Sequence, residues 1–120
     1  MVYAADSLAL AAIEKFVHLG DEGRTLKYVS YRIGIPANVR IDERKLHDLP
    51  KDWKKDPAPQ STMDLGSEWV QDARSPALKL PSITIETNCN YLLNPLHPDF
   101  PRLILSPPYP FAFDSRIWKN

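Results

Sequence analysis

The sequence is short of cysteine, glycine, histidine and net charge. Of 120 residues, one is cysteine, four are glycine and three are histidine, and 15 basic side chains balance 15 acidic ones. A single cysteine, Cys89, cannot form an internal disulfide, and four isolated glycines cannot build a phosphate-binding loop. The histidines have no metal-ligand spacing, so no metal site is expected. A neutral chain also has no field that draws it to nucleic acid or to an anionic membrane.

Long hydrophobic runs are missing too. No apolar stretch approaches the roughly 18 residues that a membrane span needs. The N-terminal stretch lacks a positive first region and is interrupted by Asp6 and Glu14, which argues against a signal peptide. Hydrophobic residues at 43% and charged residues at 25% are typical of globular proteins. These features predict a soluble cytoplasmic protein with one domain over residues 1–120.

Proline is the residue in excess. There are twelve prolines, and six of them lie between Pro95 and Pro110, where they exclude long helices. Aliphatic and aromatic side chains are interleaved with these prolines, as at Leu103, Ile104, Leu105, Tyr109, Phe111 and Phe113. The last third is therefore expected to form short strands and ordered loops and not a flexible tail.

The remaining pattern mixes helix and strand in an irregular order, which predicts an α+β fold with a mixed sheet. Alternation predicts a strand over 26–36, and short strands are expected at 77–80, 82–85 and 102–105. Residues 37–60 are expected to be mostly connection, anchored by Leu49, Pro50 and Trp53. The segment NCNYLLNPLHPDF, at 88–100, is expected to be a loop because it is rich in asparagine and turn formers.

Two helices are expected. The first, over 7–19, has Asp6 or Ser7 as its cap and an apolar arc so wide that it should pack on more than one side. The second, over 61–73, has Ser61 as its cap and should bury three side chains, namely Met63, Trp69 and Val70.

Few residues are candidates for chemistry. Glu14 lies at the edge of the apolar arc, where a carboxylate is either a surface residue or an active-site acid in a cleft, and periodicity alone favours the surface. Ser82 follows a proline at a strand edge, a position typical of local hydrogen bonding. Cys89 has no activating neighbour in sequence and is expected to be a packed small residue. The loop amides and the His97–Asp99 turn are most simply structural, so these residues alone do not identify an enzyme.

Five blocks of the sequence, in this order, resemble the RES domain family. They are VYAADSLALAAIEKFVH at 2–18, LPKDW at 49–53, LGSEWVQDARSPALKLPS at 65–82, NYLLNPLHPDF at 90–100 and PFAFDSR at 110–116. The alanine-rich helix with its glutamate, the leucine–proline–serine strand and the NYLLNP-type loop form a specific combination, and the blocks span almost the whole chain.

The resemblance implies a fold like that of ADP-ribosyltransferase toxins. It also implies an enzyme that depletes NAD by cleaving the nicotinamide–ribose bond, as a glycohydrolase or a phosphorylase. Glu14 and Ser82 match the catalytic glutamate and serine, Tyr3 matches a tyrosine that lines the NAD site, and Asn90 lies in the family's loop near that site. The implied substrate is NAD, and no metal takes part.

RES proteins are toxins paired with Xre-type antitoxins, so the implied partner is such an antitoxin, and a homodimer stays open. No membrane or nucleic-acid partner is expected. Family members carry an arginine-bearing segment upstream of the tyrosine that is missing here, so we expect an N-terminally incomplete domain. The alternative function is therefore an inert remnant that only binds the antitoxin. The acceptor of the ADP-ribosyl group, whether water, phosphate or protein, is left open.

Overall fold

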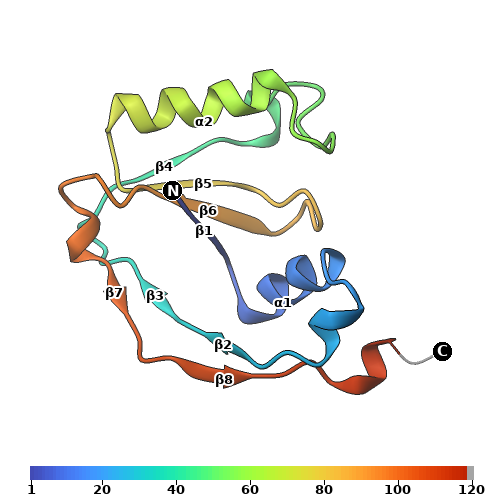
Figure 1. The fold of residues 1–120 in the computed structure, drawn as a ribbon. Coiled ribbons are helices and arrows are strands. Elements are labelled where there is room, and N and C mark those ends of the chain that lie inside the picture. The colour runs from blue at the N-terminus through green and yellow to red at the C-terminus, as the bar shows by residue number, and fades with distance from the viewer. Residues whose placement is uncertain (119–120) are drawn as a thin grey trace.

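A mixed four-stranded sheet forms the centre of the fold, which a computed structural model describes for residues 1–118 (Figure 1). Its strands stand in the order β1 (Val2–Ala5), β6 (Cys89–Leu93), β5 (Ala77–Pro81) and β4 (Ile41–Glu43). Strand β6 is antiparallel to both of its neighbours, whereas β4 and β5 are parallel. The predicted α+β class with a mixed sheet is confirmed.

Helix α2 (Gln60–Asp72) connects β4 to β5, which is the kind of crossover that neighbouring parallel strands require. Its Trp69 is 2% exposed and packs in one cluster with Leu78 of β5 and Leu92 of β6. The helix ends at Ala73, which takes the left-handed conformation with φ 48°. The second predicted helix is therefore correct to within one residue at its start, and so is the burial of Trp69.

Two details of α2 were wrong. Met63 is 55% exposed, because it lies on the solvent side of the helix and not on the side that meets the sheet. Ser61 does not cap the helix: Pro59 occupies that position, and the Ser61 hydroxyl donates to Asp52 Oδ1 at 3.0 Å. Trp53, in contrast, is buried as expected of an anchor in the connection.

Helix α1 (Leu8–Val17) follows β1 and is capped by Ser7, whose Oγ accepts a hydrogen bond from Leu10 N at 3.1 Å. The expectation that its apolar arc packs on several sides was wrong, since Leu10 is its single buried residue. Val17, for example, is 59% exposed. Near the end of α1, Phe16 meets Phe113 with 6.2 Å between ring centroids, so the C-terminal aromatic side chains hold this end of the helix.

A two-part antiparallel ribbon forms the rest of the fold. Strand β2 (Tyr28–Ser30) pairs with β8 (Tyr109–Phe111), and β3 (Ile33–Gly34) pairs with β7 (Ile104–Leu105). The single strand predicted at 26–36 is split because Arg32 N donates to the Ser106 side chain instead of continuing the ladder. The described part of the proline-rich C-terminal third forms short strands and ordered loops, as predicted.

The ribbon curves away from the central sheet (Figure 1), which makes the molecule open in shape. Its radius of gyration is 15.6 Å, against about 14 Å for a typical domain of this length. Apolar side chains of the ribbon are consequently left in contact with solvent: Val29, Ile104, Leu105 and Tyr109 are all more than half exposed. Among the described residues, neither helix is long and apolar enough to cross a membrane.

Several strands differ from the sequence-based expectation. Residues 82–85 are a loop and not a strand, since Ser82 leaves the sheet after Pro81. The asparagine-rich segment contains the central strand β6, which pairs on both sides and so outweighs the turn preference of its asparagines. Strands β1, β4 and β8 were not predicted. Short 3-10 turns complete the chain at Asp21–Arg24, Leu46–Asp48, Phe100–Arg102 and Ser115–Trp118.

Candidate functional site

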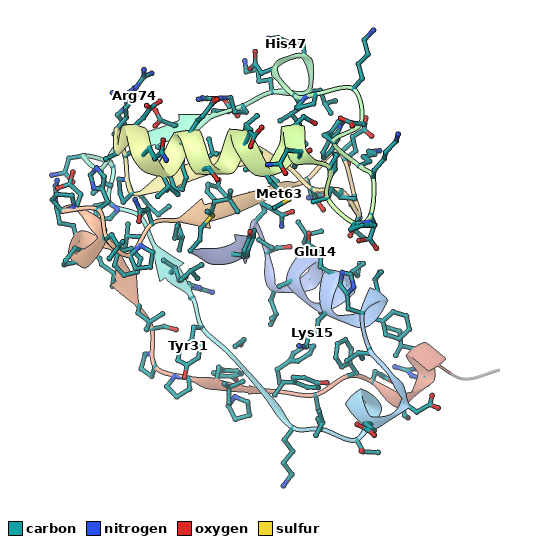
Figure 2. All side chains as sticks on the ribbon, turned by 45° about the horizontal axis from the view of Figure 1, so that its top comes forward. Glu14, Lys15, Tyr31, His47, Met63 and Arg74 are labelled. Atoms are coloured by element: carbon teal, nitrogen blue, oxygen red, sulfur yellow. The ribbon has the colours of Figure 1, made fainter. Side chains whose placement is uncertain are left out.

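Glu14 extends from α1 toward the central sheet, whereas Lys15 extends away from it (Figure 2). Its carboxylate is half-buried and is held from two sides. Ser82 Oγ donates to Glu14 Oε2 at 2.9 Å, and Asn90 Nδ2 donates to Glu14 Oε1 at 2.9 Å. The structure thus brings together three of the four residues singled out from the sequence, and they come from α1, the end of β5 and β6.

Ser82 is fully buried, and its hydroxyl is saturated with hydrogen bonds. Besides donating to Glu14, Ser82 Oγ accepts from Thr84 N at 3.1 Å and from Ile85 N at 3.2 Å. A serine hydroxyl has one proton and two lone pairs, so all of its capacity is in use. In this arrangement Ser82 orients Glu14 and has no further proton to offer a ligand.

Asn90 uses both amide hydrogens. Its Nδ2 bridges Glu14 and the carbonyl oxygen of Ala4, which lies at 3.3 Å. Among residues 1–118, no hydrogen bond is formed to the Asn90 Oδ1 atom, which leaves this oxygen available as an acceptor. Asn90, which the sequence predicts to stabilise a loop, is therefore a residue of strand β6 that contacts the carboxylate.

Tyr3 does not join this group. It lies on β1, one residue before Ala4, and its side chain is 75% exposed. Its strand pairs with β6, where its partner in register is Leu92, two positions from Asn90. The ring therefore lies on the strand beside the Glu14 group, open to solvent, and is available to stack against a ligand.

Cys89, next to Asn90, is not an activated nucleophile. Burial raises the pKa of its thiol, and the nearby Asp6 carboxylate raises it further, more than Lys79 can offset. A thiol with a raised pKa is mostly protonated and unreactive at neutral pH. The interpretation of Cys89 as a small structural residue agrees with this environment. His97 and Asp99 share a turn as expected, since Asp99 N donates to His97 Nδ1 at 2.9 Å.

Asp6 is the residue near the site that the sequence did not single out. It directly follows β1, and its Oδ2 accepts a hydrogen bond from Cys89 N at 2.7 Å. The sequence offered it only as an alternative helix cap, because its partner lies 83 residues away. No local pattern reveals such a long-range contact.

Two hollows of the described surface lie away from these residues. One, of about 530 Å³, runs between α2 and residues 44–50 and is rich in carboxylates. The other, of about 250 Å³, is bordered by Glu43, Pro81 and Cys89. Neither is lined by Glu14, Ser82 or Asn90, but size alone does not make a site. Within residues 1–118, no group of three or more His, Cys, Asp and Glu side chains gathers as metal ligands.

Comparison with known proteins supports the resemblance to the RES domain family that the five sequence blocks carry. The model of the RES domain family matches residues 1–114. A protein named Toxin Res from Yersinia enterocolitica is 37% identical over 118 residues, covering 97% of this chain and 76% of the relative. A second Toxin Res, from Photorhabdus laumondii, is 36% identical and covers 98% of this chain and 76% of the relative.

A third relative carries a more specific name. The Prs ADP-ribosylating toxin of Sphingobium sp. is 37% identical over 101 residues, which cover 82% of this chain and 63% of the relative. The family model matches nearly the whole chain, and the alignments with the two Toxin Res proteins also cover nearly all of it. The chain therefore belongs to the RES domain family.

Proposed function

We propose that this chain acts as a toxin that depletes NAD by breaking the bond between nicotinamide and ribose. The observation that carries the proposal is the Glu14 carboxylate, which is half-buried and held by one donor on each oxygen. A carboxylate fixed in this way is an electrostatic group already in place before the reaction. The name of the Sphingobium relative, an ADP-ribosylating toxin, supports chemistry at the same bond.

The reaction places a clear demand on the site. When the N-glycosidic bond breaks, its electron pair leaves with nicotinamide, which departs as a neutral molecule. The ribose is left with positive charge of the oxocarbenium type, as in glycoside hydrolysis. Water then adds to the ribose carbon and loses a proton, giving ADP-ribose. Phosphate in place of water gives the phosphorylated sugar.

Glu14 meets this demand with its negative charge. The carboxylate stabilises the developing positive charge and accepts a hydrogen bond from a ribose hydroxyl. Ser82 and Asn90 hold the carboxylate in one orientation, so no reorganisation is needed in the transition state. The free Oδ1 of Asn90 is a second acceptor for the ribose beside it.

Tyr3 has a different task in this proposal. Its exposed ring packs against the nicotinamide or the ribose, as an aromatic face does with a flat or apolar partner. The contact binds the substrate and takes no part in bond breaking. Removing the ring should therefore raise KM more than it lowers kcat.

The test is incubation of the purified chain with NAD. Nicotinamide release is followed by chromatography, and mass spectrometry of the second product distinguishes ADP-ribose from its phosphate ester and from a labelled protein. The assay is run in phosphate-free and in phosphate buffer. The proposal expects release of nicotinamide in at least one condition, and no release in either would refute it.

A second candidate function is binding of a protein partner without turnover. It is favoured by the exposed apolar side chains of the ribbon, where Val29, Ile104 and Tyr109 face solvent. Large exposed apolar surfaces are typical of protein interaction sites. For a toxin the partner is an Xre-type antitoxin, and the chain then acts as an inert binder.

The two candidates are separated by one pair of measurements. Co-expression with an Xre-type protein encoded beside it, followed by size-exclusion chromatography, tests for the complex. A stable complex together with an NAD-inactive chain supports the binder. If the free chain cleaves NAD and the complex does not, the chain is an enzyme that its partner inhibits.

A further inference from the structure

We propose that Asp6 is a positioning residue of the Glu14 site, which keeps Asn90 in contact with the carboxylate by fixing the strand on which Asn90 lies. The inference rests on the proposed function and adds a residue to it. It is carried by hydrogen bonds that join the end of β1 to β6 directly beside Asn90.

The first step is the way in which Asp6 closes the β1–β6 pairing. The regular register ends with Ala5 opposite Asn90. Asp6 N then donates to Cys89 O at 3.0 Å, and Cys89 N donates to Asp6 Oδ2 at 2.7 Å. The side-chain carboxylate thus accepts the bond that a backbone carbonyl accepts in an ordinary rung.

The substitution of carboxylate for carbonyl has a structural consequence. Because the Cys89 N–H is satisfied by the side chain, the backbone at Asp6 is free to turn out of the sheet. Ser7 follows at once in an extended conformation, with φ −146°, and caps α1 through Leu10 N. Asp6 therefore sets both the last bonded position of β1 and the point at which the helix bearing Glu14 begins.

The second step connects this junction to the site. Asn90 follows Cys89 on β6, and its Nδ2 reaches back to Ala4 O while donating to Glu14 Oε1. If β1 and β6 separate at Cys89, the Ala4 carbonyl and the Asn90 amide move apart. The contact with Glu14 depends on the same amide, so the pair loses its alignment as well.

The Asp6 carboxylate also acts electrostatically on the residue that follows Asn90 on β6. Burial raises the pKa of Tyr91, which lies on the far side of Asn90, and the Asp6 carboxylate raises it further while Lys79 lowers it. Glu43 faces Lys79 across β4 and β5, with 4.0 Å between the charged atoms. Asp6 thus acts on both neighbours of Asn90, Cys89 and Tyr91.

The experiment compares three variants of the full chain. Asp6→Ala removes the acceptor, Asp6→Asn keeps an oxygen acceptor without the charge, and Glu68→Ala removes an exposed acid from α2 as a control. Each is measured for kcat and KM with NAD and for its thermal midpoint. The side-chain amide signals of Asn90 are followed by NMR, after assignment through their loss in Asn90→Asp.

We expect Asp6→Ala to lower kcat by about 10- to 100-fold with KM changed by less than about 3-fold, because a misplaced group affects the reacting geometry more than binding. The Asn90 amide signals should shift in this variant. Asp6→Asn should recover most of kcat and the original signals, and Glu68→Ala should match the unmodified chain. A merely structural role would lower the thermal midpoint without this rescue pattern.

The proposal is overturned if Asp6→Ala keeps kcat, if the Asn90 signals do not move, or if Asp6→Asn is as impaired as Asp6→Ala. Should Asp6→Ala fail to fold, Asp6→Ser takes its place, since its shorter side chain cannot span the same distance to Cys89 N. If the unmodified chain releases no nicotinamide, the proposed function fails by itself. The amide signals then decide alone whether Asp6 holds Asn90 in place.

Discussion

Replacing Ser82 with alanine should lower both stability and turnover, because one hydroxyl serves three partners. It donates to a charged acceptor, Glu14, and accepts from the backbone N–H groups of Thr84 and Ile85. A hydrogen bond to a charged group contributes about 1.5–3 kcal/mol and a neutral one about 0.5–1.5 kcal/mol. Thr84 is an exposed residue, and water can replace part of the lost bond to its N–H, so we expect a loss of about 2–4 kcal/mol and not the full sum.

Ser75→Ala is the matched control. Ser75 is also buried, at 1% exposure, and its hydroxyl shares its one proton between a carboxylate oxygen of Asp42, at 2.9 Å, and the carbonyl oxygen of Ala77, at 2.8 Å. This pair lies between β4 and the start of β5 and does not touch Glu14. Both variants should therefore melt earlier, by about 10 °C for a loss of about 3 kcal/mol, but only Ser82→Ala should lower kcat, by about 10- to 100-fold.

The assay combines urea denaturation, thermal melting and NAD turnover per folded molecule. A double-mutant cycle with Glu14→Gln isolates the contact: the stability cost of Ser82→Ala should be about 1 kcal/mol smaller when Glu14 is already neutral. Equal kcat losses in Ser75→Ala and Ser82→Ala would refute the reasoning. So would a Ser82→Ala variant with unchanged stability.

Three further predictions concern the scaffold. Trp69→Ala should lose about 3–5 kcal/mol because it empties the core between α2 and the sheet, whereas Met63→Ala on the exposed side should stay within about 0.5 kcal/mol; equal urea midpoints would contradict this packing. Ala73→Gly should raise stability by about 0.5–1 kcal/mol, since glycine adopts the left-handed conformation without strain, and a lower urea midpoint would count against it. Cys89, whose pKa burial raises, should react with iodoacetamide at pH 7.5 at least about 10-fold more slowly than an unhindered cysteine, and equal rates would show that its environment is misjudged.

The elements that could be predicted from the sequence are those defined by local patterns. Helix α2 was expected from a start signal at Ser61, although Pro59 takes the cap position, and its Trp69 is buried as expected. Asp6 and Ser7 were the two candidate caps of α1, and Ser7 is the one that the structure uses. Strand β5 was expected over 77–80 and lies at Ala77–Pro81. Each of these signals lies within one turn or one strand of the residue that it concerns.

The parts that failed depend on pairing across the chain. Strand β6 is rich in asparagine, which favours turns, and it becomes a strand only because β1 and β5 bond to its two edges. The wide apolar arc of α1 suggested burial on several sides, yet too few elements surround the helix to cover it. A single-helix pattern carries no information on what packs around the helix.

The candidate site also depends on contacts between residues that are far apart in the sequence. Periodicity favoured a surface position for Glu14, because its donors lie 68 and 76 residues away in Ser82 and Asn90. The family resemblance selected these residues, and the structure places three of them in contact. Asp6 could not be predicted as a site residue, because its contact with Cys89 joins residues that lie 83 positions apart in the sequence.

The most direct test of the account is the rate of nicotinamide release by Glu14→Gln, measured beside Glu68→Gln and the unmodified chain. Glutamine keeps the size of Glu14 and removes its charge, so the Ser82 contact survives while the amide faces the Asn90 donor. The account predicts that Glu14→Gln releases nicotinamide at least about 100-fold more slowly than Glu68→Gln, with thermal midpoints above the assay temperature for both. Equal rates in the two variants would contradict the claim that the fixed Glu14 carboxylate is the centre of the site.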